Sequence, residues 1–544
     1  MNSKKTKRNL GYVLLPLFLC IGIVGGILIG AYVEKRTISP AQHKLQTILG
    51  LIRDQYVDQI DIDSLMESSI PDLLASLDPH SAYIPASELT KTNDELEGSF
   101  GGVGVSFQII SDTVHVIEVV AGGPSEKAGI LPGDRILKAG DKELSGHGVS
   151  SEDVFKTLRG PEGTPVKLTV KRSSANKPLE FEIVRGQIPQ NSVDASYMMS
   201  DNIGYIRVGK FARTTYSEFA QALNKLRNQG AEKYVVDLRN NSGGYMDQAI
   251  YMANEFLPSG RMIVYTKGRL PENETMAVSD GSGDYQDAEL TVLMNEYSAS
   301  ASEIFAGAIQ DNDRGLVIGR RSFGKGLVQN QTQLPDSSAI RLTVARYYIP
   351  SGRSIQKEYS RGRDGKYDLD IVSRYNHGEF YSQDSIKLGD KKFSTVGGRT
   401  VYGGGGIMPD VFVPEDTVGI TSYYIEAINK GLIQKFCHNL SEKYRPLMKE
   451  KTLEAMNRVV PRDQSLLTAF VDFAAANGLP ARWYYINKSR NLLLNQIRGV
   501  LARDLIGYEA FIEILNDQDN TVRKAGELLR DGKSPVTIPA KKEK

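Results

Sequence analysis

The residues best placed for chemistry are two side chains in separate loops, Ser300 and Lys325. Ser300 follows a predicted strand at residues 290–294 and lies near the start of a predicted helix at 298–310. Active sites of α/β sheets gather where strands end and helices begin, because free backbone N–H groups and the positive helix end stabilise a developing oxyanion there. Ser300 and Glu303 also fit a capping box, which requires no catalysis. This stretch alone therefore leaves a structural and a catalytic serine open.

Lys325 lies between Gly324 and Gly326, and apolar residues flank the triplet. A lysine acts as a base near neutral pH only if its ammonium loses a proton, and burial favours that loss by disfavouring the charged form. A serine paired with such a lysine needs no histidine. Gly-Lys-Gly is also common in surface loops, so an ordinary loop stays open as the alternative. A phosphate-binding loop fits less well, since Gly319 precedes Lys325 by six residues and Gly326 follows it.

A third stretch, residues 237–244, reads Asp-Leu-Arg-Asn-Asn-Ser-Gly-Gly. It predicts a strand that ends in a double-glycine turn, where a backbone N–H can approach a ligand closely. We predict that the N–H of Gly243 supplies half of an oxyanion hole and that of Ala301 the other half. The alternative is an ordinary turn between a strand and a helix.

The composition excludes several classes of protein. The net charge of +1 gives no broad basic field for nucleic acid. Of the two cysteines, Cys20 lies in an apolar run and Cys437 far from it, so we expect neither a disulfide framework nor a Cys-rich zinc site. None of the six histidines forms an HExxH motif or a close pair. The chemistry predicted above needs no metal and no organic cofactor.

The N-terminus carries a membrane signal. Basic residues at positions 4–8 precede an uncharged run at 10–33, which exceeds the ~20 residues needed to span hydrocarbon. Basic residues ahead of the run place the N-terminus in the cytoplasm and the rest of the chain outside. A cleaved signal peptide is the alternative, but its apolar region is usually shorter, ~7–15 residues. We therefore expect a single-pass anchor in the inner (cytoplasmic) membrane, with the catalytic part periplasmic or otherwise extracytoplasmic.

The predicted secondary structure changes along the chain. Residues 40–97 have helical spacing, with a break at 78–81. Residues 98–184 hold short β-rich runs punctuated by Gly and Pro, among them a predicted strand at 135–139, and a short helix is predicted at 151–158. From residue 202 strands and helices alternate, which indicates an α/β core. We predict a mixed α/β, multi-domain protein with these parts: a membrane anchor or signal at 1–35, a helical N-terminal segment at 36–97, a β-rich module at 98–185, an α/β core at 186–415 with a charged, Gly-rich insertion or hairpin at about 355–400, and a helical C-terminal region at 416–544.

Several motifs in one order resemble the carboxyl-terminal processing (tail-specific) serine proteases. They are Ser-Ala-Ser-Ala-Ser-Glu-Ile at 298–304, Ser-Phe-Gly-Lys-Gly-x-Val-Gln at 322–329 and the turn at 237–244, with further matches at 77–83, 348–355 and 405–410. The resemblance covers about residues 40–415 and implies a crotonase-like α/β protease core. The helical region after 416 lies outside it.

The resemblance also implies the roles of individual residues. Ser300 matches the nucleophile, Lys325 the general base and Gln329 the residue that orients the lysine. Gly243 and Ala301 match the oxyanion donors. The chain departs from the family pattern at Ser242, where Pro or Gly is usual, and this change does not touch the chemistry. Family members also lead us to expect dimerisation through the terminal regions or an activating partner.

The β-rich module resembles a PDZ domain. Gly102-Val103-Gly104-Val105 precedes a longer motif at 123–137, Gly-Pro-Ser-Glu-Lys-Ala-Gly-Ile-Leu-Pro-Gly-Asp-Arg-Ile-Leu. A PDZ groove adds a peptide as an extra strand and holds its terminal carboxylate on the backbone N–H groups of a glycine loop. We expect Val103, Gly104 and Val105 to form that loop and to bind the C-termini of protein substrates. The alternative is that these glycines only turn the chain.

Two competing functions are open at this stage. The turn at 241–244 is also similar to the nucleophile turn of trypsin-like proteases, which would make Ser242 the nucleophile. That fold needs a β-barrel carrying a His and an Asp before Ser242, and the helical stretch and the PDZ-like module leave no room for one. The other candidate is a non-catalytic PDZ scaffold on a protease-like core, which would tolerate loss of Ser300 and Lys325. His80 could suggest a general base, but an Asp-Pro-His turn is more often structural.

Overall fold

The computed structural model describes residues 39–110, 112–146, 148–200, 202–362, 365–389 and 391–532. The chain divides into two compact units, Met1–Leu77 and Asp78–Lys544. The described part of the first unit consists of helices α2 (Pro40–Gln55) and α3 (Ile62–Ala75), as the helical spacing predicts. Ser39 caps α2: its Oγ accepts from the Gln42 N–H at 3.2 Å, and Gln42 Oε1 accepts from the Ser39 N–H at 2.7 Å.

The membrane prediction falls outside these residues. No helix in the described part of the chain is long and apolar enough to cross a bilayer. The run at 10–33, on which the anchor was predicted, is not among the described residues.

The second unit begins its β-rich module with a six-stranded antiparallel sheet. Its order is β3-β4-β5-β7-β8, and β6 pairs with β5. The predicted strand at 135–139 and helix at 151–158 are confirmed with the same bounds. The elements of the module are β2 (Ser99–Gly102), β3 (Val105–Ile110), β4 (Thr113–Val119), α5 (Pro124–Ala128), β5 (Arg135–Ala139), β6 (Lys142–Glu143), α6 (Ser151–Leu158), β7 (Pro165–Lys171), β8 (Leu179–Val184) and β9 (Gly186–Pro189).

A six-stranded sheet forms the centre of the α/β core, in the order β10-β11-β12-β15-β16-β21. All neighbours pair in parallel except β10 and β11. Strands β12 and β15 are almost continuously apolar and buried, because helices cover both faces of a parallel sheet. Its strands are β10 (Val193–Ser200), β11 (Ile203–Val208), β12 (Lys233–Asp237), β15 (Glu289–Met294), β16 (Leu316–Gly319) and β21 (Val411–Phe412).

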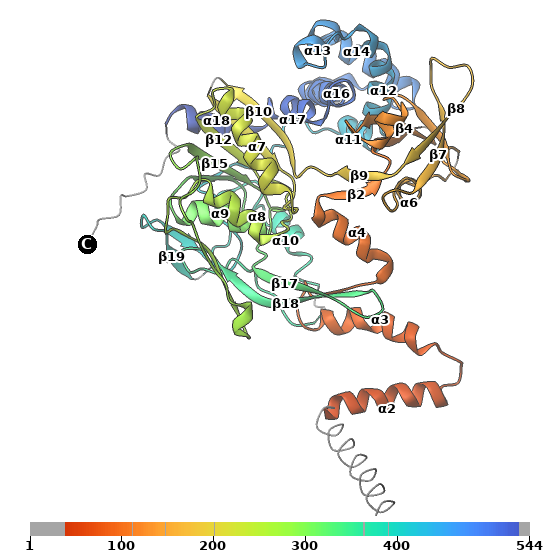
Figure 1. Ribbon diagram of the computed structural model, residues 1–544. Helices are drawn as coiled ribbons and strands as arrows, with labels where there is room; N and C mark the ends of the chain where they lie inside the picture. The colour runs from red at the N-terminus through yellow and green to blue at the C-terminus, as the bar shows by residue number, and fades with distance from the viewer. Residues whose placement is uncertain are drawn as a thin grey trace, which may run out of the picture. The chain divides into compact units, whose positions relative to one another are not determined.

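Three helices, α7 (Thr215–Asn228), α8 (Met246–Asn254) and α9 (Ala301–Asp311), form the first helical layer on this sheet (Figure 1). Their apolar side chains share one buried cluster with sheet residues such as Ile206, Val236 and Val292. Every residue of α9 is buried. The helix that begins beside Ser300 is therefore held on all sides.

A second sheet, in the order β1-β18-β13-β14 with β17 on β18, packs beside the first helical layer. Its strand β1 corrects the sequence-based expectation that residues 36–97 are helical, because residues 82–84 pair antiparallel with 339–341 of β18. The edge of β18 selects this extended segment, which directly follows the predicted break at 78–81. The strands are β1 (Ala82–Ile84), β13 (Met262–Gly268), β14 (Met276–Val278), β17 (Leu327–Gln333) and β18 (Ala339–Tyr348); α4 (Ala86–Glu97) follows β1, and η1 (Pro271–Asn273) lies between β13 and β14.

The predicted insertion at about 355–400 contains short elements, including an antiparallel pair of strands. These elements are α10 (Asp370–Asn376), η2 (Gln383–Ser385), β19 (Lys392–Ser394) and β20 (Thr400–Tyr402).

The C-terminal region is helical, as predicted, and has a core of its own. Its helices are α11 (Ser422–Asn429), α12 (Leu432–Tyr444), η3 (Arg445–Leu447), α13 (Leu453–Val459), α14 (Gln464–Ala476), α15 (Trp483–Lys488), α16 (Arg490–Leu505), α17 (Tyr508–Asn516) and α18 (Asn520–Arg530).

The last helix does not stay with that core. Val522, Ala525 and Leu529 of α18 share a buried cluster with Tyr205 of β11 and Val235 of β12. Helix α18 therefore covers the face of the central sheet opposite α7, α8 and α9 (Figure 1).

Candidate active site

Ser300 lies between β15 and α9, in a backbone conformation that non-glycine residues rarely adopt, with φ 57° and ψ −115°. The Glu303 carboxylate accepts from the Ser300 N–H at 2.8 Å, which is one half of the predicted capping box. The Glu303 N–H donates to the Ser300 carbonyl oxygen at 2.9 Å. A strained serine at the start of a fully buried helix is held there by its surroundings, which is a common feature of functional sites.

The turn at 238–244 and the loop at 295–302 are joined by hydrogen bonds from both sides. Asn241 accepts at its carbonyl oxygen from the Ala299 N–H at 3.0 Å and from Ser302 Oγ at 2.9 Å. Ser298 Oγ donates to the Leu238 carbonyl at 2.8 Å. These bonds fix the double-glycine turn against the segment that carries Ser300, as the predicted site requires.

Gly243 lies directly against this segment. A Cβ at position 243 would come within 2.7 Å of Ser300 Cβ and 2.8 Å of the Ala299 carbonyl oxygen, and its φ is +100°. Only glycine fits this position. Its N–H donates to Asn241 Oδ1 at 2.8 Å. The predicted oxyanion donor is thus engaged within its own turn and must share or exchange this bond to hold an oxyanion.

Lys325 lies just before β17 and is half-buried. Burial, and then the positive charge of Arg341, lower the pKa of Lys325 below its usual value, while the negative charges of Glu303 and Asp78 oppose the shift. Among the described residues, the Lys325 amino group forms no hydrogen bond or ion pair. This environment favours the neutral amine.

Gln329, the predicted orienting residue, follows a β-bulge between Val328 and Gln329 in β17. Its Nε2 is buried and has no hydrogen-bond partner among the described residues. A buried amide without a partner is costly and is typical of a group that awaits a ligand, a water or a moving side chain. The role of Gln329 at Lys325 stays a prediction.

Glu303 joins the serine and lysine loops, a role that the capping-box interpretation missed. Besides the Ser300 N–H, its buried carboxylate accepts from Ser322 Oγ at 2.5 Å, the Gly324 N–H at 2.8 Å and the Lys325 N–H at 2.9 Å. Burial raises the pKa of Glu303 to about 7, against the lowering effect of these hydrogen bonds. The glutamate was the available sequence signal for this bridge. A carboxylate that is buried at the start of a helix needs several hydrogen-bond donors, and these can come from a second loop.

Tyr347 of β18 bridges the same two loops. Its hydroxyl donates to the Ser300 carbonyl oxygen at 3.1 Å and makes a second contact with the Lys325 carbonyl oxygen. Phe323 adds a direct bond, from its N–H to the Ser298 carbonyl at 3.0 Å. The structure therefore brings the two predicted loops together through their backbones.

The turn before β1 places Asp78 and His80 on the lysine side of the site. The Asp78 carboxylate accepts from the N–H groups of His80 (2.8 Å) and Ser81 (2.9 Å) and from Thr343 Oγ1 of β18 (3.0 Å). Burial, with the positive charges of Lys325 and Lys357, lowers the pKa of His80 to about 4. A neutral imidazole therefore lies near Lys325, and its Nε2 is 2.6 Å from the Tyr367 hydroxyl.

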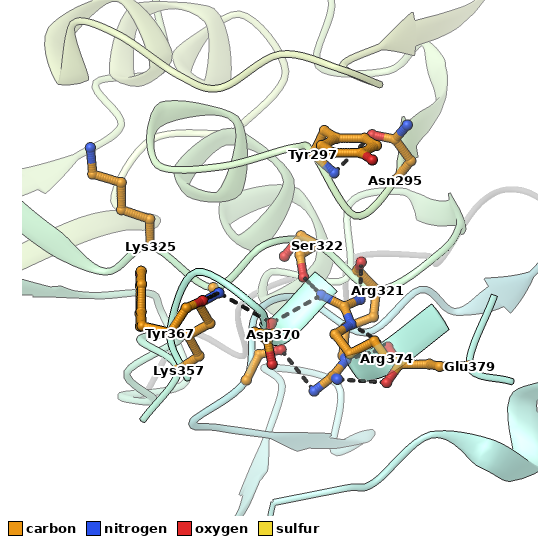
Figure 2. A network of polar contacts seen from close by, with 12 residues as sticks. Asn295, Tyr297, Arg321, Ser322, Lys325, Lys357, Tyr367, Asp370, Arg374 and Glu379 are labelled. Carbon is orange, nitrogen blue, oxygen red and sulfur yellow. Dashed lines mark hydrogen bonds and ion pairs between the residues drawn. The ribbon is translucent and has the colours of Figure 1, made fainter. Parts of the chain in front are cut away.

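The insertion holds the lysine loop from its other side (Figure 2). Arg374 donates to the carbonyl oxygens of Ser322 (3.0 Å) and Arg321 (2.7 Å), and both arginines form ion pairs with Glu379. Lys357 lies over the rings of Phe323 and Tyr367 and binds Asp370 at 3.1 Å. Figure 2 shows the Lys325 side chain extending away from this network. The network therefore fixes the backbone of the loop, and within the described part of the chain it leaves the amino group of Lys325 unpaired.

The predicted carboxylate loop of the PDZ-like module joins β2 and β3. Gly102 ends β2, Val103 is buried, Gly104 has φ +81° and Val105 begins β3. The carbonyl oxygens of Val103 and Gly104 accept from the N–H groups of Ser125 and Val120. The loop thus has the position between two strands that a peptide groove requires.

These features define a class: a serine-type peptidase on an α/β core, with a PDZ-like module in the same chain. Family models match in three places. Residues 202–362 match Peptidase family S41, residues 101–183 match the PDZ domain, and residues 423–507 match a family of unknown function. No three side chains in the described residues are grouped so that they could hold a metal ion.

Relatives point to one family. The chain is 41% identical over 310 residues to a carboxy-terminal-processing protease of Bartonella bacilliformis, covering 56% of this chain and 70% of that protein. It is 31% identical to a probable CtpA-like serine protease of Staphylococcus haemolyticus, covering 74% and 79%. A solved photosystem II D1 C-terminal processing protease is 28% identical, covers 60% of this chain and 93% of its own, and has a TM-score of 0.33. The chain belongs to the carboxy-terminal-processing proteases and is a serine peptidase.

Proposed function

We propose that this protease cuts with a Ser300/Lys325 dyad. The observation that carries the proposal is the joining of the two loops by Glu303, whose carboxylate binds the backbone N–H groups of both Ser300 and Lys325. The strained backbone of Ser300 and the desolvated amine of Lys325 support it.

The reaction begins when neutral Lys325 takes the proton of Ser300 Oγ. The oxygen forms a bond with the scissile carbonyl carbon, and the carbonyl electron pair moves to the oxygen, which Gly243 and Ala301 bind through their N–H groups. The Lys325 ammonium then gives its proton to the leaving nitrogen as the C–N bond breaks. Water hydrolyses the acyl-enzyme by the same route and regenerates both groups.

Gly243 must change partners in this scheme. Its N–H leaves or shares Asn241 Oδ1 when the oxyanion forms. A charged oxyanion is a stronger acceptor than a neutral side-chain amide, so the exchange is favourable in the transition state. Gln329 Nε2 is a buried donor without a partner among the described residues. The amide that carries it would hold the lysine once substrate fills the site.

Substrate selection in this proposal falls to the PDZ domain. The loop from Gly102 to Val105 binds the C-terminal carboxylate of a protein substrate, and the substrate adds a strand at β3. The uncharged run at 10–33 supports an extracytoplasmic enzyme tethered to the inner membrane by its N-terminus. A homodimer or an activating partner would complete the regulated enzyme.

The test is cleavage of an unstructured protein with an apolar C-terminus by the parent chain and by Ser300→Ala. We expect only the parent to cleave, while both bind the substrate. Equal cleavage by both would reject Ser300 as the nucleophile. Binding without cleavage by either chain would favour the alternative of a PDZ scaffold.

A further inference from the structure

Asp519, at the start of α18, makes two kinds of contact at once. Its Oδ1 caps the helix by accepting from the N–H groups of Thr521 (2.9 Å) and Val522 (3.0 Å). Its Oδ2 accepts from Arg239 Nη1 at 2.7 Å. The cap anchors the carboxylate in a helix that packs on the central sheet, so the second oxygen reaches Arg239 from a fixed position.

Arg239 in turn binds the carboxylate of Asp237, at the end of β12. Its Nε lies 3.0 Å from both carboxylate oxygens and its Nη2 lies 2.6 Å from Oδ2, while the Arg239 N–H donates to Oδ1 at 2.9 Å. The Tyr205 hydroxyl completes the set at 2.7 Å. Burial acts to raise the pKa of Asp237, but Arg239 and Tyr205 outweigh it and hold the carboxyl below its usual range. The guanidinium is therefore clamped between one carboxylate from the sheet and one from α18.

Arg239 immediately precedes the residues that fix the oxyanion turn. The Asn240 N–H donates to Asn295 Oδ1 at 2.9 Å, and Asn295 Nδ2 returns a bond to Asn240 Oδ1 at 2.8 Å. Asn240 has φ +61°, and the next residue, Asn241, holds the Gly243 N–H. A shift of Arg239 would thus move a strained turn that bonds directly to the Ser300 segment.

Packing alone does not hold this turn. A cavity of about 420 Å³ lies beside it, lined by Arg239, Asn240, Asn295 and Asp519 among other residues. This space lies beside the Arg239–Asn240 end of the turn, whereas Gly243 packs directly against the Ser300 segment. The position of the Arg239 end therefore depends on its polar contacts.

We propose that Asp519 is a positioning residue for the protease reaction, which acts through Arg239 to hold the turn at 238–244 where the oxyanion forms. The inference rests on the proposed function of Ser300 and Gly243. The inference assigns the C-terminal helical region a role in catalysis, since α18 covers one face of the sheet that carries the site. Cleavage therefore depends on a contact that lies outside the residues matched by the peptidase family model.

The test is Asp519→Asn in the full chain. Asparagine caps a helix about as well as aspartate, so the variant keeps α18 and removes the charge that binds Arg239. The matched control is Glu527→Gln, which removes an exposed charge from the same helix. We expect kcat to fall about 10- to 100-fold for Asp519→Asn with KM within about twofold, and neither to change for the control.

A second readout separates positioning from stability. A peptide aldehyde forms a tetrahedral adduct with the serine and uses the oxyanion hole, whereas a product peptide does not. Affinity for the aldehyde should fall in parallel with kcat in Asp519→Asn, while affinity for the product peptide and the melting temperature stay near those of the control. Equal aldehyde affinity in the two variants, or a loss of kcat that follows the loss of folded protein, would overturn the inference.

Arg239→Lys covers the case in which Asp519→Asn does not fold. Lysine keeps the charge beside Asp237 but cannot bridge two carboxylates with a planar fork. It should show the same loss of aldehyde affinity, and a parent-like affinity would reject the proposal. An inactive Ser300→Ala beside an unaffected Asp519→Asn would reject this inference alone, whereas an active Ser300→Ala would reject the proposed function.

Discussion

The two halves of the site are built differently. On the nucleophile side, the turn at 238–244 and the loop at 295–302 bind each other through backbone and buried side chains. On the base side, Glu303 and Arg374 fix the backbone of the lysine loop and Glu303 also binds the Ser322 hydroxyl. The amino group of Lys325 has no hydrogen bond or ion pair within the described residues.

The difference follows from what each half must do. The backbone that carries the oxyanion donors works best when it is fixed, since a larger reorganisation would add to the barrier. The Gly243 N–H then exchanges Asn241 Oδ1 for the oxyanion without a movement of the whole turn. A general base must be neutral, and an ion pair at its head group would keep a lysine protonated. A rigid nucleophile side and a lysine fixed only through its backbone therefore serve one reaction.

Replacing the general base should have the largest effect on activity. Lys325→Arg keeps a positive side chain in the loop, but a guanidinium stays protonated and cannot accept the Ser300 proton. We expect kcat to fall by about 10⁴-fold or more while the melting temperature changes little. Substrate turnover and thermal unfolding of the same preparation check this, and robust cleavage by the variant would remove Lys325 from the mechanism.

Gly243→Ala breaks the nucleophile side. The new methyl group would lie 2.7 Å from Ser300 Cβ, and alanine is strained at φ +100°, so the turn must move. We expect a loss of about 10²–10³ in kcat, the effect of removing one oxyanion donor. Ser242→Ala is the matched control in the same turn, with near-parent activity. An active Gly243→Ala enzyme would place the oxyanion elsewhere.

Glu303→Gln acts on both halves together. The amide would turn an NH₂ group toward donors that now share the carboxylate, and a buried unsatisfied donor costs about 1–3 kcal/mol. We expect a lower free energy of unfolding together with a loss of about 100-fold in kcat, because both reacting side chains shift. Denaturant unfolding and steady-state kinetics measure the two effects, and a loss of stability without a loss of kcat would confine Glu303 to the fold.

Gln329→Leu tests the base side more gently. If the amide holds Lys325 by one hydrogen bond, kcat should fall by about tenfold. This factor corresponds to a loss of ~1.4 kcal/mol in transition-state stabilisation, the size of one hydrogen bond. Stability should stay equal or rise, since the substitution removes a buried Nε2 without a partner. Unchanged kcat with raised stability would show that Gln329 does not orient the lysine.

The smallest expected effect concerns the pH profile. Cleavage should increase with pH as Lys325 loses its proton, and the positive charge of Arg341 helps to lower the pKa of Lys325. In Arg341→Gln that pKa is raised, so the neutral fraction at a given pH falls and the rise in kcat/KM moves to higher pH, by less than about one unit. The control is Arg346→Gln, on the same strand. Identical rises in all three proteins would remove Arg341 from the shift, and a flat profile in the parent would argue against a titrating lysine.

Much of the fold followed from local patterns. The buried strands β12 and β15 read as apolar runs, and helix α6 and strand β5 were predicted with their observed bounds. The serine loop, the lysine loop and the double-glycine turn could be predicted because strand ends and glycine turns depend on residues that are neighbours in the sequence. The strand at residues 82–84 was missed, because its pairing partner lies more than two hundred residues away in β18.

The sequence by itself determined which residues could react: a serine at a strand end, a lysine between glycines and a double-glycine turn. Only the tertiary structure decided how they are held. It turned Glu303 from a helix cap into a bridge between two loops, engaged the Gly243 N–H with Asn241, brought His80 near Lys325, and laid α18 over the central sheet. Local patterns report backbone preference and which face is apolar. The partners of buried polar groups are set by segments distant in the chain, whose contacts form only when the sheets and helices pack.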